Sequence, residues 1–263
     1  MSFFCIFAKE IKIMTTDVNN LQSINCQRKD CILPYFDKYD VENLRRATNL
    51  PHWHQNYKYV FITARLADSI PQEKLSILKE EKEIWMKKHP QPWDAEMCVE
   101  YFEKFVKTVD KWLDNNYGNC LLKNPDNRKI VENALLFFDE VRYNLKAYVV
   151  MPNHVHILLQ LYKGFDIENV MCSIKSFTAK KINERMNRKG RVWQSEFFDR
   201  IIRTEDHYKN VLKYIISNDE SIAWIKDDAI PYYCELNPQK SFDTIREDAD
   251  CPDSEPTASS QLE

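Results

Sequence analysis

The spacing of apolar residues along the chain predicts a succession of strands and helices. β-Branched and aromatic stretches bounded by turn residues are typical of strands. They occur at residues 57–66, 143–151, 156–161 and 197–203. Apolar residues three and four positions apart, or a charged stretch between turn signals, indicate helices. These segments are residues 72–89, 95–115, 127–138, 166–188 and 205–218.

The two central strands are joined by a short turn at Pro152 and Asn153, which favours an antiparallel hairpin. The predicted fold class is therefore α+β, with helices packed on an antiparallel sheet, rather than a doubly wound parallel sheet. Asp166 is a candidate N-cap for the helix that follows this hairpin. The residues expected on the core side of that helix are Val170, Ile174, Phe177 and Ile182.

These elements fall into one predicted domain at residues 45–235, with a helical insertion near residues 72–125. Residues 1–44 are polar and irregular, and we expect an N-terminal extension that is poorly ordered in part. Residues 236–263 are rich in Ser, Asp, Glu and Pro, a composition that favours disorder. We therefore expect the domain to be followed by an acidic disordered tail.

Composition excludes several classes of protein. With 44% hydrophobic and 29% charged residues, the 263-residue chain has the make-up of an ordinary globular protein. Its 3 glycines are too scattered for a dinucleotide-binding or Walker phosphate loop. Its 8 cysteines include no CxxC pair, so we expect reduced thiols in a cytoplasm. No apolar run approaches the roughly 18 residues of a membrane span, and no membrane association is expected.

Charge is distributed unevenly along the chain, although the net charge is only −3. Residues 163–213 contain 12 Lys and Arg against 7 Asp and Glu, a local excess of +5. Residues 239–263 contain 2 against 7, a local excess of −5. A basic stretch offset by an acidic tail is compatible with nucleic-acid binding. A solvated helix face followed by a disordered tail explains the same pattern, and both interpretations stay open here.

The most specific chemical feature is the sequence His154-Val155-His156. Alternate residues of a strand point to the same face, so both imidazoles project together while Val155 turns toward the core. Two such imidazoles can share a divalent ion if a third ligand comes from elsewhere. Two half-exposed strand residues are the alternative. A second motif, His52-Trp53-His54, precedes the first strand, where no rigid pleat fixes the pair.

The last predicted helix carries a further candidate pair, because Tyr214 and Asn218 are four residues apart and share one helix face. Asn218 offers a carbonyl oxygen to a hard cation such as Mg²⁺ or Mn²⁺. Tyr214 offers a phenol that can attack phosphorus and form a phosphotyrosine. Taken alone, a helical tyrosine is most often a core or interface residue.

The stretch from Arg142 to Asn218 resembles the REP-associated tyrosine transposases of the HUH single-strand endonuclease superfamily. The matching segments are AYVVMPNHVHILL, SIKSFTAKKIN, VWQSEFFDRIIRTEDHY and LKYIISN. Upstream, LPHWHQNYKYVFITARLADSIP is similar to the first-strand region of that family, so the resemblance extends over residues 44–224.

This resemblance implies an RRM-like (ferredoxin-like) antiparallel sheet, the HUH endonuclease fold. It makes His154, His156 and Asn218 the ligands of Mg²⁺ or Mn²⁺, and Tyr214 the nucleophile. The implied activity is that of a transposase that nicks and joins single-stranded DNA beside hairpin (palindromic) repeats through a 5′-phosphotyrosine. The implied protein is a monomer or homodimer, cytoplasmic and nucleoid-associated.

The sequence departs from the family where Asp219 and Glu220 follow Asn218 in place of the usual proline. Extra negative charge near a phosphate site weakens DNA binding or shifts metal preference. A domesticated, non-catalytic protein that binds hairpin DNA on the same fold is therefore the alternative. An RNA-binding RRM lacks its aromatic motif here, and a zinc hydrolase lacks HExxH.

Basic and aromatic residues around the last two helices are the predicted DNA contacts. They are Lys175, Lys180, Lys181, Arg185, Arg188, Lys189, Arg191, Trp193, Arg200 and Arg203. Cations would neutralise the phosphate backbone and make the affinity sensitive to salt. Trp193 and Phe197 are candidates for base stacking, although core packing is the expected role of Phe197. A solvated charge is the alternative for each lysine.

Overall fold

The computed structural model describes residues 35–36, 55, 57–90, 93–219 and 223–232. The predicted acidic tail, the motif at residues 52–54 and all of the predicted N-terminal extension except Tyr35 and Phe36 lie outside these residues. Among the helices described, none is both long and apolar enough to cross a membrane.

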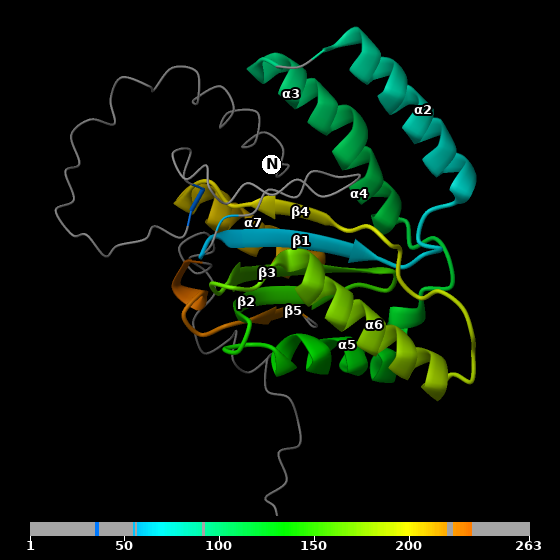
Figure 1. The fold of residues 1–263 in the computed structure, drawn as a ribbon, viewed down its shortest axis with the longest axis vertical. Coiled ribbons are helices and arrows are strands. Elements are labelled where there is room, and N and C mark those ends of the chain that lie inside the picture. Colours follow the sequence, from blue (N-terminus) through cyan, green and yellow to red (C-terminus); the bar gives the residue numbers. More distant parts are fainter. Residues whose placement is uncertain (1–34, 37–54, 56, 91–92, 220–222, 233–263) are drawn as a thin grey trace, which may run out of the picture.

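A five-stranded sheet in the order β4-β1-β3-β2-β5 forms the centre of the molecule (Figure 1). Each pair of neighbouring strands is antiparallel. The strands are β1 (Tyr59–Arg65), β2 (Tyr143–Val150), β3 (His154–Leu161), β4 (Phe198–Ile201) and β5 (Ala223–Ile225). With helices between β1 and β2 and between β3 and β4, the first four strands follow the ferredoxin-like β-α-β-β-α-β pattern. The predicted α+β class is confirmed.

The helices lie close to the predicted segments. They are α2 (Gln72–Lys88), α3 (Ala95–Tyr101), α4 (Lys107–Asp114), α5 (Pro125–Phe137), α6 (Ile167–Arg185) and α7 (Glu205–Asn218). A π-helical segment at Phe102–Val106 joins α3 to α4 where one continuous helix was predicted. The short strand β5 was not predicted.

Side-chain caps begin several of the described helices. Asp166 accepts a hydrogen bond from the backbone N–H of Asn169 at the start of α6, as predicted. Asn124 caps α5, and Pro125 occupies its first turn. Thr204 accepts from the N–H of His207 at the start of α7. Each cap accepts a hydrogen bond from a backbone N–H that has no partner within the first helical turn.

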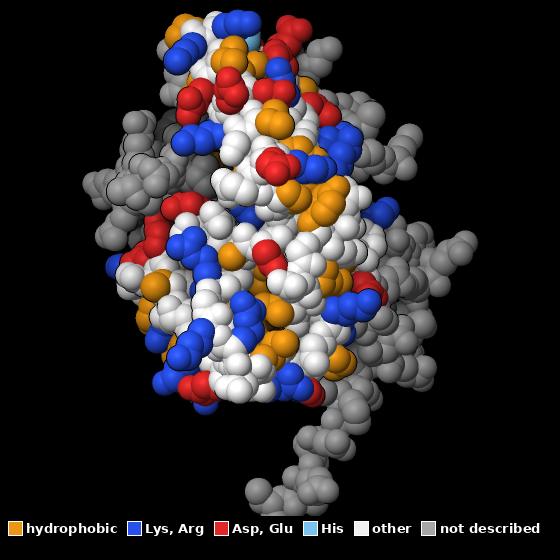
Figure 2. All heavy atoms as spheres, turned by 90° about the vertical axis from the view of Figure 1, so that its right-hand side faces the viewer, with side chains coloured by type: hydrophobic (Ala, Val, Ile, Leu, Met, Phe, Trp, Pro, Cys, Tyr) orange, Lys and Arg blue, Asp and Glu red, His pale blue; other side chains and the backbone are white. Residues whose placement is uncertain are grey.

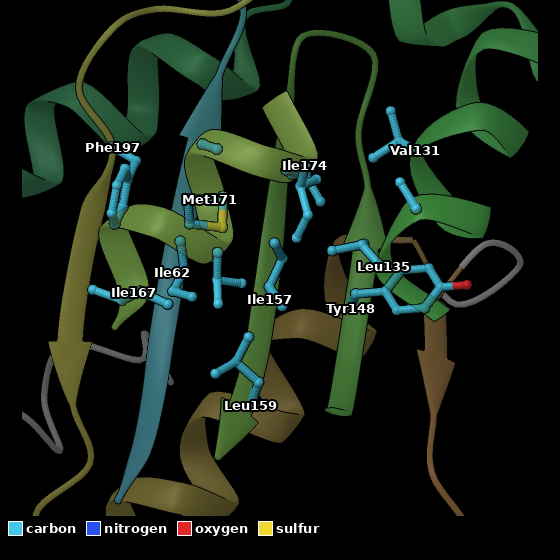
Figure 3. Close-up of a cluster of buried hydrophobic side chains, with 14 of the residues drawn as sticks. Ile62, Val131, Leu135, Tyr148, Ile157, Leu159, Ile167, Met171, Ile174 and Phe197 are labelled. Atoms are coloured by element: carbon cyan, nitrogen blue, oxygen red, sulfur yellow. The ribbon is translucent and has the colours of Figure 1, made fainter. Parts of the chain in front are cut away.

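The sheet buries a different cluster on each face. Ile157 and Leu159 of β3 point to the face covered by α5 and α6 (Figure 3). Val155 belongs to the same larger hydrophobic cluster. Leu158 points to the opposite face and packs with residues of α7. Because strand residues alternate between faces, His154 and His156 project to the α7 face together with Leu158.

The predicted core side of α6 needs one correction. Val170, Ile174 and Ile182 are buried as expected, but the Phe177 side chain is 51% exposed. Thr178 takes the core position instead, with its hydroxyl donating to the carbonyl of Ile174 at 2.7 Å. The difference is one of helical phase, since residue 178 lies closer than residue 177 to the line through 174 and 182.

Helices α2, α3 and α4 form an arm between β1 and α5, within the region of the predicted insertion (Figure 1). The arm contains its own aromatic cluster around the buried Trp85. The Trp85 ring stacks on His89 with centroids 4.2 Å apart and meets Trp93 edge to face at 5.0 Å. Its indole N–H donates to Glu100 at 2.7 Å. The arm thus has an aromatic cluster of its own.

Candidate active site

The two histidines of the HxH motif meet at the start of β3. His154 and His156 pair across the sheet with Arg65 and Thr63 of β1, respectively. Their Nε2 atoms lie 3.1 Å apart. Two ligand atoms at right angles around a metal, each about 2.1 Å from it, are separated by about 3 Å. The spacing of these two nitrogens therefore fits neighbouring positions on one hexacoordinate divalent ion.

Neighbouring side chains hold both rings by their Nδ1 atoms. The Oδ1 atom of Asn153 lies 2.7 Å from Nδ1 of His154. Because a carbonyl oxygen can only accept, this contact places the proton of His154 on Nδ1 and leaves Nε2 as a lone pair. The hydroxyl of Thr63 lies 2.8 Å from Nδ1 of His156. Such partners fix ring orientation in metal sites.

Burial keeps both imidazoles neutral. The exposed fractions of His154 and His156 are 0% and 1%, so the alternative of two half-exposed strand residues is wrong. Burial lowers the pKa of His154 to about 4. Burial, together with the nearby His154, lowers the pKa of His156 well below its ordinary value. The free-base form, which is the one that binds metals, therefore prevails near neutral pH.

Tyr214 reaches this pair from α7. Its hydroxyl lies 3.3 Å from Nε2 of His156. The Tyr214 ring meets His156 and Phe61 edge to face, with centroids 5.0 Å and 6.0 Å away. Phe61 also stacks on His156 at 5.4 Å, so one aromatic ring supports both. The structure thus brings the predicted nucleophile next to the two histidines of the predicted metal site.

The environment of Tyr214 favours the protonated phenol. Burial raises its pKa most, and the carboxylates of Asp110 and Asp114 raise it further. A side-chain hydrogen bond with Asn218 acts in the opposite direction. A positive charge brought close to this phenol would therefore favour its ionisation.

Asn218 lies one helical turn after Tyr214, as predicted. Its amide nitrogen donates to the backbone carbonyl of Tyr214 at 2.7 Å, and its side chain is half-buried. Within the described part of the chain, no three His, Cys, Asp or Glu side chains group to hold a metal. The amide of Asn218 is the third ligand predicted from the sequence.

Two acidic residues of α4 belong to this site but were not predicted. Asp110 and Asp114 are one turn apart and act electrostatically on Tyr214. Burial raises the pKa of Asp110 to about 7, and Asp114 adds to the rise. Asn153 fixes the position of this helix, since its amide nitrogen donates to the carbonyl of Leu113 at 3.2 Å. The sequence carries a partial signal only for Asn153, which directly precedes His154.

The predicted DNA-binding cations on α6 do not surround Tyr214. Helix α6 packs on the sheet face opposite α7. Several of its cations also have protein partners: Lys175 donates to the carbonyl of Ser195 at 2.7 Å, and Arg185 pairs with Asp126. Lys180 and Lys181 lie 4.0 Å and 3.4 Å from the Glu184 carboxylate.

The remaining predicted DNA contacts lie in the loop after α6 and on or next to strand β4. The Arg200 guanidinium lies over the Phe102 ring at 5.2 Å, and that of Arg203 over Phe36 at 5.8 Å. The expectation for Trp193 needs correction, because its ring is only 5% exposed. Its indole N–H donates to the Thr178 hydroxyl at 2.9 Å. A ring held in the core in this way does not stack on bases.

The geometry is that of a candidate metal and nucleophile site on an antiparallel sheet. Residues 115–218 match the family described as "Transposase IS200 like". The match confirms the predicted relationship to transposases, and it contains both histidines, Tyr214 and Asn218. Strand β1 and helices α2 to α4 precede it.

Comparison with other proteins adds two findings. A search of curated proteins gave no match. Among solved structures, the chain is similar to a REP-associated tyrosine transposase bound to a REP hairpin, with 15% sequence identity and a TM-score of 0.32. That similarity covers 65% of this chain and 72% of the other.

Proposed function

We propose that this protein is a metal-dependent endonuclease and strand transferase that acts on single-stranded DNA near hairpin repeats. The observation that supports it most is the contact between the Tyr214 hydroxyl and His156, at 3.3 Å, beside the paired Nε2 atoms of the two histidines. A nucleophile next to a candidate cation site is what in-line attack on a phosphodiester requires. The domain for this activity is residues 45–235.

The site residues have different roles in the proposed reaction. His154, His156 and Asn218 would hold a divalent cation, Mg²⁺ or Mn²⁺, and its positive charge would polarise the phosphate and lower the pKa of the phenol. The Tyr214 oxygen forms a bond to phosphorus while the bond from phosphorus to the 3′ oxygen breaks. The phenol loses its proton and the 3′ oxygen gains one. A 5′-phosphotyrosine and a free 3′-hydroxyl result.

Rejoining is the reverse of this step. The 3′-hydroxyl of another strand attacks the phosphotyrosine, the Tyr214 oxygen leaves, and the phenol regains a proton. Because one phosphodiester is exchanged for another through a phosphotyrosine, no nucleoside triphosphate is needed. A DNA substrate of this kind also places the protein in the cytoplasm, associated with the nucleoid. The contact between Tyr214 and His156 lies within one chain, which supports cleavage by a monomer, and a homodimer is the alternative.

A hairpin-binding protein without catalytic activity is the second candidate. The raised pKa of Tyr214 and the carboxylates of Asp110 and Asp114 beside it favour this alternative, because they oppose both phenolate formation and the approach of a phosphate. Asp219 adds another acid directly after Asn218, and Glu220 lies outside the described residues. The two candidates differ in whether a covalent adduct with DNA forms.

The test is to incubate the protein with hairpin-flanked single-stranded DNA and Mn²⁺ and to separate the products on a denaturing gel. The DNA carries its label at the 3′ end, so that a 5′-phosphotyrosine adduct retains it. We expect a labelled protein–DNA band that disappears with EDTA and with Tyr214→Phe, while DNA binding persists. Tyr208→Phe, a buried tyrosine of the same helix, is the matched control and should keep the band. An adduct that survives Tyr214→Phe would refute the assignment, and binding without any adduct would favour the second candidate.

A further inference from the structure

Arg65 lies at the end of β1, next to the histidine pair. It is the cross-strand partner of His154. The carbonyl of Arg65 accepts from the N–H of Gln194 at 2.9 Å, on the side of β1 that faces away from β3. Arg65 and His154 therefore form a non-hydrogen-bonded pair, in which the two Cα atoms are typically about 4.5 Å apart and the side chains lie close together.

The side chain of Arg65 projects to the face of the sheet that carries the candidate active site. Thr63, two residues earlier on the same strand, contacts Nδ1 of His156 on that face. Because alternate residues of a strand share a face, Arg65 projects to it as well. Phe61, two residues before Thr63, stacks on His156 and meets Tyr214 there. Strand β1 thus supplies three successive side chains to the site.

The guanidinium of Arg65 has no ion-pair partner among the described residues. Its one described hydrogen bond goes from Nη1 to the hydroxyl of Ser69, at 3.2 Å. Burial lowers the pKa of the Arg65 guanidinium, and no carboxylate of the described part of the chain acts in the opposite direction. An arginine nevertheless stays protonated in a protein. The site therefore contains a partly buried positive charge that no described carboxylate neutralises.

The chemistry of this guanidinium suits a phosphate. A charge held partly out of water without a counterion is unfavourable, so its position indicates an anionic partner. The Ser69 hydroxyl donates to the carbonyl of Leu66 at 2.8 Å, and it therefore holds Arg65 as an acceptor without neutralising its charge. The guanidinium has five N–H donors, which leaves several for a ligand. Two of them in parallel match two oxygens of a phosphate.

Neighbouring elements fix the backbone at this end of the sheet. The N–H of Leu66 donates to the carbonyl of Asn153 at 2.8 Å. The Asn153 side chain also holds α4 by the carbonyl of Leu113, and α4 lies beside this end of β1 (Figure 1). Figure 2, which views the molecule from this end, shows Lys and Arg side chains interspersed with acidic and apolar ones. An individual cation such as Arg65 is therefore the expected source of positive charge for a phosphate here.

We propose that the guanidinium of Arg65 binds a non-bridging oxygen of the phosphate that Tyr214 attacks. This inference rests on the proposed function, because it assumes that a DNA phosphodiester occupies the site. In the proposed step, the Tyr214 oxygen bonds to phosphorus while the bond to the 3′ oxygen breaks, and Arg65 stays protonated throughout. Its hydrogen bonds stabilise the charge on the non-bridging oxygens during this exchange. Its charge also offsets the carboxylates of Asp110 and Asp114 that act on Tyr214.

The first test measures binding of fluorescent, hairpin-flanked single-stranded DNA to the full chain by anisotropy, in EDTA and over a series of salt concentrations. Arg65→Gln should weaken binding about tenfold and reduce the salt slope by about 0.7, the value for one lost phosphate contact on single-stranded DNA. Arg65→Lys keeps the charge and should retain the slope.

Arg142→Gln is the matched control for this test. Arg142 is also partly buried, and its Nη1 also donates to a serine hydroxyl, that of Ser173, at 3.3 Å. Its carbonyl accepts from the N–H of Tyr162, just after the end of β3, so it lies at the end of the sheet far from His154. Arg142→Gln should change neither affinity nor slope.

The second test measures the rate of covalent adduct formation with Mn²⁺ at saturating DNA. Arg65→Gln should form the adduct about 100-fold more slowly, as is typical when one donor that stabilises transition-state charge is lost. Arg142→Gln and Ser69→Ala should react at the wild-type rate. An equal loss of rate in Ser69→Ala would show that Arg65 acts by holding the turn after β1, and it would overturn the proposal.

The outcomes separate this inference from the proposed function. Unchanged affinity, slope and rate in Arg65→Gln, beside a wild-type protein that forms the adduct, would overturn the role of Arg65 and leave the nuclease proposal intact. A lower slope with an unchanged rate would also overturn it, because the phosphate bound would not be the one attacked. If the wild type binds DNA but forms no adduct, the nuclease proposal fails, whereas a lower slope in Arg65→Gln would still support the phosphate contact.

Discussion

Each imidazole of the candidate site is oriented by one neutral polar neighbour. Thr63 contacts Nδ1 of His156, and Asn153 contacts Nδ1 of His154. Neither neighbour touches the Nε2 atoms, which face each other at 3.1 Å. The effect of Thr63 on metal binding is therefore indirect: it holds a ring whose free nitrogen is the proposed ligand.

Replacing Thr63 tests this role. Thr63→Val keeps the shape of the side chain and removes the hydroxyl, so the His156 ring loses its only side-chain hydrogen-bond partner on Nδ1 among the described contacts. We expect the affinity for Mn²⁺ to fall about tenfold, as is typical when a partner of a metal-ligating histidine is lost. Calorimetric titration with Mn²⁺ measures this. Thr63→Ser retains the hydroxyl and should bind nearly as the wild type does, and equal affinity in Thr63→Val would contradict the role.

Asp110 is expected to make the free energy of unfolding depend on pH. Burial, followed by the charge of Asp114, raises its pKa from 3.8 to about 7 in the folded protein. Between about pH 4 and pH 7 the folded state therefore holds a proton that the unfolded chain has lost. In that range the contribution of Asp110 to the free energy of unfolding decreases as pH rises.

Asp110→Asn should remove this dependence. The amide mimics the protonated carboxyl, so the variant should be more stable than the wild type at pH 8, with a difference that shrinks toward pH 4. Urea denaturation across this pH range measures the free energy of unfolding. Glu80→Gln, an exposed carboxylate on α2, serves as the control and should follow the wild-type profile. Parallel profiles for Asp110→Asn and the wild type would show that this carboxyl does not titrate as inferred.

Local spacing explains why some site residues were predictable and others were not. His154 and His156 share a face because they are two apart on a strand, and Tyr214 and Asn218 because they are four apart on a helix. Those relations depend only on the element type. Thr63 and Asp110 become neighbours of the site through strand pairing and helix packing over long stretches of chain. No pattern around either residue in the sequence indicates this.

At the scale of elements, the hydrophobic pattern predicted the strands and helices that carry most of the core. Boundaries differ by a few residues, as with β3, which begins at His154 where residue 156 was expected. Strand β5 was missed because three residues are too short to display a period. The π-helical turn at Phe102–Val106 was missed because apolar spacing around it still resembles that of an α-helix.

At the scale of the whole molecule, the sheet separates the α6 cations from the α7 tyrosine, although both lie in one basic stretch of the sequence. The basic stretch of residues 163–213 contains both the α6 cations and the α7 tyrosine. In the structure, α6 and α7 cover opposite faces of the sheet. The distribution of charge along a chain does not reveal which face of a sheet a helix covers. This separation could therefore be recognised only from the structure.

The position of β1 leads to a prediction about the matched segment. Residues 115–218 contain β2, β3 and β4 but not β1. In the intact sheet, β1 lies between β4 and β3 and pairs with both. A fragment of residues 115–218 therefore loses the strand that joins β4 to the hairpin. We expect it to lack a cooperative thermal transition by circular dichroism, whereas the full chain shows one. A fragment that melts cooperatively would show that β1 is dispensable.

The late position of Tyr214 has a consequence for the protein while it is being made. A ribosome releases the histidine motif 58 residues before the tyrosine that contacts it. A nascent chain, or a product of premature termination within that interval, can form the hairpin that carries the imidazoles but has no phenol to attach to DNA. The proposed cutting activity is thus withheld until translation has passed α7.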